Sequence, residues 1–201
     1  MSVAATQPLS RSELASTTPT AFDTGPVDDV MRRARAAQRL FAEVSQEEAD
    51  AAVRALAWAL YKPEHARELA ELAVADTGLG NVPDKIRKKQ RKTFGTLRDL
   101  LRGRSVGIIE EDPAKGLVKY AKPMGVIGAV TPSTNPGATP VNKAMMAVKG
   151  RNAIVIAPSP LGYRTTARIV ELMRAELERI GLPADLVQIL PHPVTKDSTE
   201  A

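Results

Sequence analysis

Two short apolar runs, 125–130 and 153–157, constrain the fold of this chain more than any other feature. A proline lies close behind each run, and such runs between breakers are typical of strands buried on both faces of a parallel sheet. Between them, Thr139 and Pro140 predict the N-cap and first position of a helix, and Gly150 predicts its end. The order strand, loop, helix, strand predicts a βαβ unit.

The loop after the first run reads TPSTNP over residues 131–136. Its prolines prevent it from continuing either a strand or a helix. It leaves the carboxyl end of the first strand, where open parallel sheets bind ligands. Asn135 is the only residue of this loop with a side-chain amide, which can donate two hydrogen bonds. An Asn that simply caps or closes the turn is the alternative to a functional Asn here.

The chain beyond this unit repeats the pattern. Residues 162–180 carry apolar side chains at helical spacing, and 186–190 form a third short apolar run. The chain from 125 onward is therefore predicted to be βαβαβ, one half of a Rossmann-like parallel sheet with right-handed crossovers. Residues 196–201 predict the start of a further helix that has no room to finish. We expect 123–201 to be a partial nucleotide-binding domain.

The chain before this unit predicts helices. Residues 1–24 are rich in Ala, Ser, Thr and Pro and predict a disordered tail, with a docking peptide as the alternative. Residues 25–103 predict four amphipathic helices. The starts of these helices are indicated by Gly25-Pro26, the capping box Ser45–Glu48, Pro63 and Asn81.

Two further patterns complete this part of the chain. The apolar face of the fourth helix is predicted at Ile86, Phe94, Leu97 and Leu101. Residues 104–122 predict a β-hairpin of two antiparallel strands. The fold class is thus α/β, with N-terminal helices and a hairpin leading into half of a parallel sheet.

Composition excludes several kinds of site. The chain has no Cys, so it forms no disulfide and offers no thiolate for metal binding or catalysis. Its apolar runs stay well short of the roughly 20 residues of a membrane span, and we expect no membrane partner. His65 and His192 have no dyad partner and are interpreted as surface residues, and no cluster has metal-ligand spacing. We expect a cytoplasmic protein, with a bacterial microcompartment as the alternative.

The loop 131–136, taken together with Arg151-Asn152-Ala153 before the second strand, resembles the start of the cofactor domain of the aldehyde dehydrogenase superfamily. Its closest resemblance is to the coenzyme A-acylating branch, which includes acetaldehyde and sulfoacetaldehyde dehydrogenases. The resemblance runs from about Val27 to the last residue. It implies a small aldehyde substrate, coenzyme A as co-substrate and NAD or NADP as cofactor.

The resemblance also assigns residues. Asn135 matches the amide donor that stabilises the oxyanion in this family. The strand-end loops are expected to contact the cofactor through Thr131, Pro132, Ser133 and Thr134, and through Ala157, Pro158, Ser159 and Pro160. Ala157 stands where many hydrolytic members have a Lys that holds the adenosine ribose, which favours the acylating branch and leaves Ser159 as the replacement hydroxyl. The hairpin 104–122 is expected to belong to an oligomerisation element, so a homo-oligomer is implied.

Six basic residues crowd the start of the fourth helix: Lys85, Arg87, Lys88, Lys89, Arg91 and Lys92. A solvated helix face is the main interpretation of this cluster. A phosphate-binding surface for the nucleotide end of coenzyme A is the alternative. Nucleic acid is not expected as a partner, because no aromatic residue interleaves the cluster and no binding motif accompanies it.

The family oxidises aldehydes through a Cys thiolate that this chain lacks. We therefore expect the chain to be the N-terminal portion of a coenzyme A-acylating aldehyde dehydrogenase whose nucleophile lies beyond residue 201. One alternative is a hydrolytic aldehyde dehydrogenase that releases a carboxylic acid. The other is a Cys-free, non-enzymatic scaffold or partner subunit.

Overall fold

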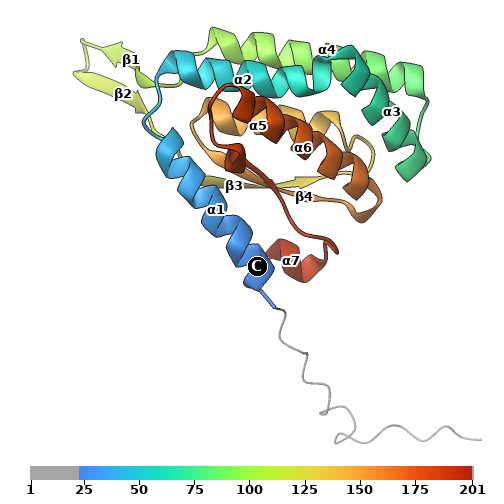
Figure 1. Cartoon of the computed structure of the whole chain (residues 1–201). Helices are drawn as coiled ribbons and strands as arrows, with labels where there is room; N and C mark the ends of the chain where they lie inside the picture. Colours follow the sequence, from blue (N-terminus) through green and yellow to red (C-terminus); the bar gives the residue numbers. More distant parts are fainter. Residues whose placement is uncertain (1–22, 201) are drawn as a thin grey trace, which may run out of the picture.

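The computed structural model describes residues 23–200 (Figure 1). The predicted disordered tail, 1–24, therefore lies outside the described residues except for its last two. The helices are α1 (Gly25–Phe41), α2 (Gln46–Tyr61), α3 (Pro63–Thr77), α4 (Val82–Arg102), α5 (Ala138–Lys149), α6 (Tyr163–Arg179) and α7 (Lys196–Glu200). The strands are β1 (Gly107–Asp112), β2 (Leu117–Ala121), β3 (Val126–Thr131), β4 (Ala153–Pro158) and β5 (Val187–Ile189). The predicted α/β class and order of elements are confirmed.

The helix starts follow local chemistry. Ser45 forms the predicted capping box, because its Oγ accepts from the Glu48 N–H at 3.2 Å while its own N–H donates to the Glu48 carboxylate at 2.8 Å. Asn81 caps α4 by accepting from the N–H of Asp84 at 2.9 Å. Gly78 ends α3 with φ of +64°, a left-handed conformation that favours glycine.

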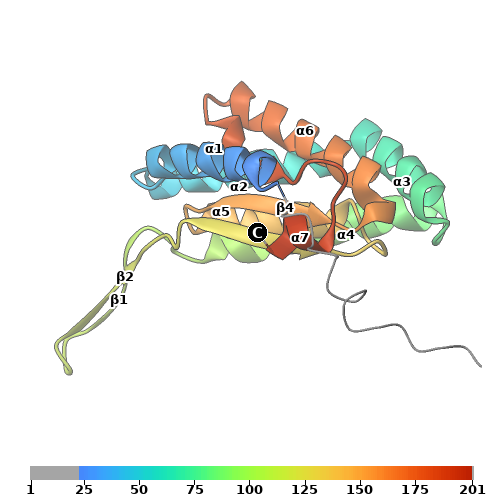
Figure 2. The ribbon, with the colours of Figure 1, turned by 90° about the horizontal axis from the view of Figure 1, so that it is seen from below.

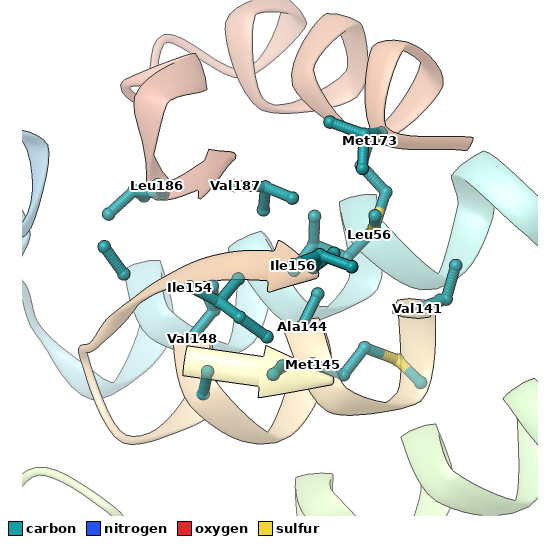
Figure 3. Close-up of a cluster of buried hydrophobic side chains, with 14 of the residues drawn as sticks. Leu56, Val141, Ala144, Met145, Val148, Ile154, Ile156, Met173, Leu186 and Val187 are labelled. Atoms are coloured by element: carbon teal, nitrogen blue, oxygen red, sulfur yellow. The ribbon is translucent and has the colours of Figure 1, made fainter. Parts of the chain in front are cut away.

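The parallel sheet has the order β3-β4-β5, with β4 at its centre. All six residues of β4 are buried. Ile154 and Ile156 point into the cluster formed with Leu56 of α2, Met173 of α6 and residues of α5 (Figure 3). Burying each such side chain contributes about 1.5–3 kcal/mol, so β4 anchors the domain.

Strand β3 differs from the prediction that it is buried on both faces. Val130 is 66% exposed and Gly128 is exposed as well. In the described part of the chain β3 pairs only with β4, so it lies at the sheet edge. Register pairs Gly128 with Val155 and Val130 with Ala157, which places these four residues on one face. Only one face of β3 is therefore well covered, although its small apolar residues predicted burial on both faces.

The helices form layers on the sheet (Figures 1 and 2). Helices α5 and α6 are the crossovers of the βαβαβ unit and pack against β4 and β5. Helix α2 packs on α5 and α6, and α4 packs on α2, α3 and α5. Helix α1 contacts all three strands and approaches the side of the sheet that carries Val130, Val155 and Ala157. The four N-terminal helices thus belong to the same packed body as the sheet.

The Arg151-Asn152 pair explains part of the sequence signature. The side-chain oxygen of Asn152 accepts from the N–H groups of Met124 and Gly125, at 2.6 and 2.9 Å. Its Nδ2 donates to the Ala147 carbonyl at 3.1 Å. Arg151 has φ of +59° and donates to the Ala121 carbonyl at 2.9 Å. These contacts join the end of α5 to the start of β3.

The hairpin β1–β2 projects away from the rest of the chain in both views (Figures 1 and 2). Its strands pair antiparallel, as predicted, with a register irregularity between Ile108 and Glu110. Leu117, Val118 and Tyr120 are 54%, 50% and 60% exposed. A two-stranded ribbon with so much exposed apolar surface is rarely stable by itself.

Candidate active site

Residues 131–137 connect β3 to α5 at the carboxyl end of the sheet, as the sequence predicts. The helix begins two residues earlier than expected, because Gly137 rather than Thr139 is the N-cap of α5. The N–H of Thr139 already donates to the carbonyl of Asn135 at 3.3 Å, which draws it into the first turn. Pro140 fits within that turn because the first N–H groups of a helix have no intrahelical partner.

Asn135 is half-buried, and its side-chain amide forms no hydrogen bond within residues 23–200. Its backbone carbonyl, not its amide, takes part in the turn. The alternative of an Asn whose side chain caps or closes the loop therefore has no contact in its favour. An amide without an internal partner can donate to a bound molecule.

A cavity of about 660 Å³ opens at the carboxyl edge beside this loop. Seven of the eight residues predicted to bind the cofactor line it: Thr131, Pro132, Ser133, Ala157, Pro158, Ser159 and Pro160. The eighth, Thr134, is exposed and does not line the cavity. The structure thus brings the two predicted loops together, because the ends of adjacent parallel strands meet at one edge.

Besides Val130 of β3, five residues near the end of the chain line this cavity without having been predicted: Val194, Thr195, Lys196, Thr199 and Glu200. They come from α7 and the segment before it. The predicted helix start at residue 196 was the only signal for them, because their proximity depends on how the chain turns back after β5. Lys196 is the cation of this cavity, and its Nζ lies 3.7 Å from Glu200.

Two buried hydroxyls beside the cavity have no hydrogen-bond partner among the described residues, Thr131 Oγ1 and Ser159 Oγ. The loops carrying them are joined by the Ser159 N–H, which donates to the Thr131 carbonyl at 3.0 Å. Unpaired buried polar atoms are uncommon, and each favours a bound polar group. Neutral hydroxyls and the one cation suit the sugar and phosphates of a nucleotide, so the residues present fit NAD or NADP.

A different environment lies on the other side of the loop. Lys89 of α4 is 1% exposed, although the basic cluster was interpreted as a solvated face. A Cβ atom added at Gly137 would lie 2.8 Å from Lys89 Cε and 3.4 Å from its Nζ, so the lysine fills the space that Gly137 leaves. Burial, together with Lys85 and Lys88, lowers the pKa of Lys89 to about 8.

The rest of the basic cluster and the predicted apolar face divide differently from expectation. Arg87, Lys88, Arg91 and Lys92 are exposed, as predicted. Phe94 is 54% exposed, whereas Lys89 and Thr93 are the buried residues of α4. Ile86, Leu97 and Leu101 are half-buried, and Leu97 packs against the core, so the predicted face was wrong only at Phe94 and lacked Lys89 and Thr93.

Neither histidine has a catalytic environment. His65 Nδ1 lies 2.9 Å from the Ala59 carbonyl, and the ring of His192 packs edge-on against Tyr163 at 4.9 Å between centroids. Residues 23–200 contain no group of three side chains placed to hold a metal ion. In the same part of the chain, no helix is both long enough and apolar enough to span a bilayer.

Known proteins resemble most of this chain, in sequence and in structure. A 56% identical relative over 170 residues is the acylating sulfoacetaldehyde dehydrogenase of Cupriavidus necator, matched over 85% of this chain and 34% of the relative. The acetylating succinate-semialdehyde dehydrogenase of Clostridium kluyveri is 38% identical, over 87% of this chain and 38% of the relative. A solved acetylating aldehyde dehydrogenase from Geobacillus thermoglucosidasius superposes with a TM-score of 0.81 at 35% identity, over 86% of this chain and 37% of that one.

The chain thus spans about a third of the length of these relatives. The sequence profile of the aldehyde dehydrogenase family matches residues 2–200, which includes the helices, the hairpin and the partial sheet. The resemblance first noted in the 131–136 loop is therefore confirmed along the chain, and this protein belongs to the aldehyde dehydrogenase family.

Proposed function

We propose that the chain forms the N-terminal portion of an NAD(P)-dependent, coenzyme A-acylating aldehyde dehydrogenase. The observation that carries this is Asn135, whose amide has no partner within residues 23–200 and whose loop runs from the cavity-lining residues 131–133 to the start of α5. The named relatives support the acylating branch, because their names describe them as acylating and acetylating dehydrogenases. The overall conversion is aldehyde, coenzyme A and NAD(P)⁺ to acyl-coenzyme A, NAD(P)H and a proton.

The nucleophile of this reaction comes from outside these 201 residues, because the chain contains no Cys. Attack of a thiolate on the aldehyde carbonyl creates a negatively charged oxygen. In this proposal the Asn135 amide donates a hydrogen bond to that oxygen, which stabilises the charge as it develops. Loss of hydride leaves a thioester, and the thiol of coenzyme A then displaces the Cys to give the acyl product.

The cofactor, when bound, supplies the hydride acceptor. This chain's contribution is to bind and orient it through the cavity that Thr131, Ser133 and Ser159 line. Ala157 offers no side-chain donor at the end of β4, so ribose contacts fall to Ser159 or to backbone groups. The Thr131 hydroxyl is the second candidate donor at the same edge.

Assembly into a homo-oligomer is part of the proposal. The hairpin projects from the body and exposes Leu117, Val118 and Tyr120. A ribbon of this kind gains stability by adding its edge to another sheet. A second copy of the chain is the simplest source of that sheet.

The test compares product formation with and without coenzyme A. The protein extended to the length of its relatives should reduce NAD(P)⁺ with a short aldehyde only when coenzyme A is present. Carboxylic acid as the product, without a coenzyme A requirement, would assign the hydrolytic reaction instead. Residues 1–201 alone are expected to be inactive because they supply no thiolate. Turnover by residues 1–201 alone would refute the proposal that the chain is only the N-terminal portion of the enzyme. If the extended protein shows no turnover, the non-enzymatic scaffold is favoured instead.

A further inference from the structure

We propose that Lys89 is the residue that binds the anionic end of the aldehyde substrate, a sulfonate or carboxylate attached one to three carbons from the carbonyl. This inference rests on the proposed function and adds a specificity-determining residue to it. Lys89 has no role in the acylation chemistry described above. Lys89 is a nearly fully buried ammonium beside the loop of Asn135.

The Lys89 ammonium occupies space that is free because residue 137 is a glycine. Lys89 Cε would lie 2.8 Å from a Cβ on Gly137, and its Nζ 3.4 Å from the same point. Thr165 Cγ2, in the first turn of α6, would lie 3.9 Å from that point. The tip of Lys89 therefore lies where the N-terminal ends of α5 and α6 come together. Any residue other than glycine at 137 would displace it.

The charge of Lys89 is uncompensated in the described part of the chain. Its Nζ forms no ion pair or hydrogen bond with residues 23–200, and Lys85 and Lys88 add positive charge nearby. The adjoining ends of α5 and α6 are themselves positive because of the helix dipole.

The buried carboxylate of α3, Asp76, is already engaged. Its Oδ2 accepts from the N–H and hydroxyl of Thr165 at 3.1 and 2.9 Å, and its Oδ1 pairs with Arg164 at 3.4 Å. A buried ammonium without a counterion is costly, so an anionic ligand that supplied the missing charge would bind favourably there.

The geometry limits the ligand to a short one. Gly137 is two residues from Asn135, and two residues span at most about 7 Å of backbone. A molecule that places its carbonyl oxygen at the Asn135 amide and its anionic group at Lys89 therefore has to be small. Two-carbon sulfonated and four-carbon carboxylated aldehydes both have this reach. The loop between the two contacts is partly open, since Thr134 is exposed.

The test uses the extended protein and compares three aldehydes: sulfoacetaldehyde, succinate semialdehyde and uncharged propanal. Lys89→Met should lower kcat/KM for the two anionic aldehydes by about 10²-fold, the effect of removing a charged hydrogen-bond donor. For propanal the change should stay within about threefold. Lys88→Met is the matched control, because it removes the same charge from an exposed neighbour on α4 and should change none of the three rates at pH 6.5, where Lys89 is protonated in both proteins.

A binding measurement keeps the test independent of turnover. Calorimetry with 2-hydroxyethanesulfonate, the alcohol analogue of sulfoacetaldehyde, should show binding to the wild-type protein that weakens at least tenfold in Lys89→Met. Lys89→Met should melt no lower than wild type, because it removes a buried unpaired charge.

Four results would overturn the assignment. They are an equal loss with all three aldehydes, a rise confined to the KM of coenzyme A, unchanged binding of the sulfonate, or a lower melting temperature. The last would mean that a carboxylate elsewhere in the extended protein pairs with Lys89. Absence of all turnover in the wild type would refute the proposed function, and the calorimetry would still decide the role of Lys89.

Discussion

The two sides of the 131–137 loop differ in almost every physical property. On one side is an open cavity of about 660 Å³ whose lining is neutral apart from Lys196 and Glu200. On the other side is a junction of α4, α5 and α6 that buries the side chain of Lys89. The cavity leaves two hydroxyls unpaired, whereas the junction holds a charge that has no ion pair among residues 23–200.

This difference indicates how one loop can serve two ligands. A large nucleotide is bound by many weak contacts spread along a sheet edge, so no single lining residue dominates its affinity. A small anion has room for few contacts, so one desolvated charge decides its affinity. Asn135 belongs to the loop between the two, and we propose that its amide donates to the reacting carbonyl.

The largest effect is expected at this shared position. Asn135→Ala in the extended protein should lower kcat by about 10²- to 10³-fold, because one donor to the oxyanion is lost. Cofactor affinity should change little, since the contact matters mainly in the transition state. Steady-state kinetics with NAD(P)⁺ as the varied substrate measures both. Turnover within twofold of wild type would make Asn135 a turn residue and remove the link between the two sides.

A smaller effect is expected from pH on the Lys89 side. The pKa of Lys89, about 8, lies below the ordinary value of 10.5, so the ammonium deprotonates above pH 8 in the free enzyme. The ratio of kcat/KM for sulfoacetaldehyde to that for propanal should therefore fall about tenfold per pH unit above pH 8.

The ratio removes titrations common to both aldehydes, including that of the nucleophile. Lys85 and Lys88 are the charged groups that act on Lys89, so Lys88→Met should move the fall to higher pH. A ratio that stays flat from pH 7 to 10 would contradict the role of the charge.

The smallest effects are expected on the cavity side. Thr131→Val and Ser159→Ala should each raise the KM for NAD(P)⁺ by about 2- to 10-fold, the range for one neutral hydrogen bond. Thr134→Val is the matched control, because Thr134 belongs to the same loop but lies outside the cavity. A loss of 10³-fold from either single change would mean that the cavity, too, depends on one contact, and the contrast between the sides would disappear.

The sequence predicted the topology because its signals are local. Prolines, glycines and short apolar runs mark where β3, β4 and β5 lie, and the Ser45 and Asn81 caps fix two helix starts. The gathering of Thr131–Ser133 with Ala157–Pro160 also followed, since it depends only on parallel strand ends sharing an edge.

What the sequence did not predict depends on contacts between distant segments. The burial of Lys89 requires the start of α4 to pack on Gly137, some 50 residues away, and a basic cluster gives no sign of it. The exposure of Val130 reflects the edge position of β3, and an apolar run looks the same at an edge as in the centre. Asn152 resembled a family signature, but its role in joining β3 to α5 became apparent only from its three hydrogen bonds.

Those three hydrogen bonds also bear on how the unit moves. Asn152 pins the amino end of β3 to the end of α5, so the strand cannot slide along its neighbour without breaking them. At the other end of the strand, the Ser159 N–H donates to the Thr131 carbonyl and the Thr166 hydroxyl donates to the Pro136 carbonyl. Strand β3 is therefore held at both ends, so a ligand at this edge meets a loop whose two ends keep the register of the sheet while residues 132–135 adjust between them.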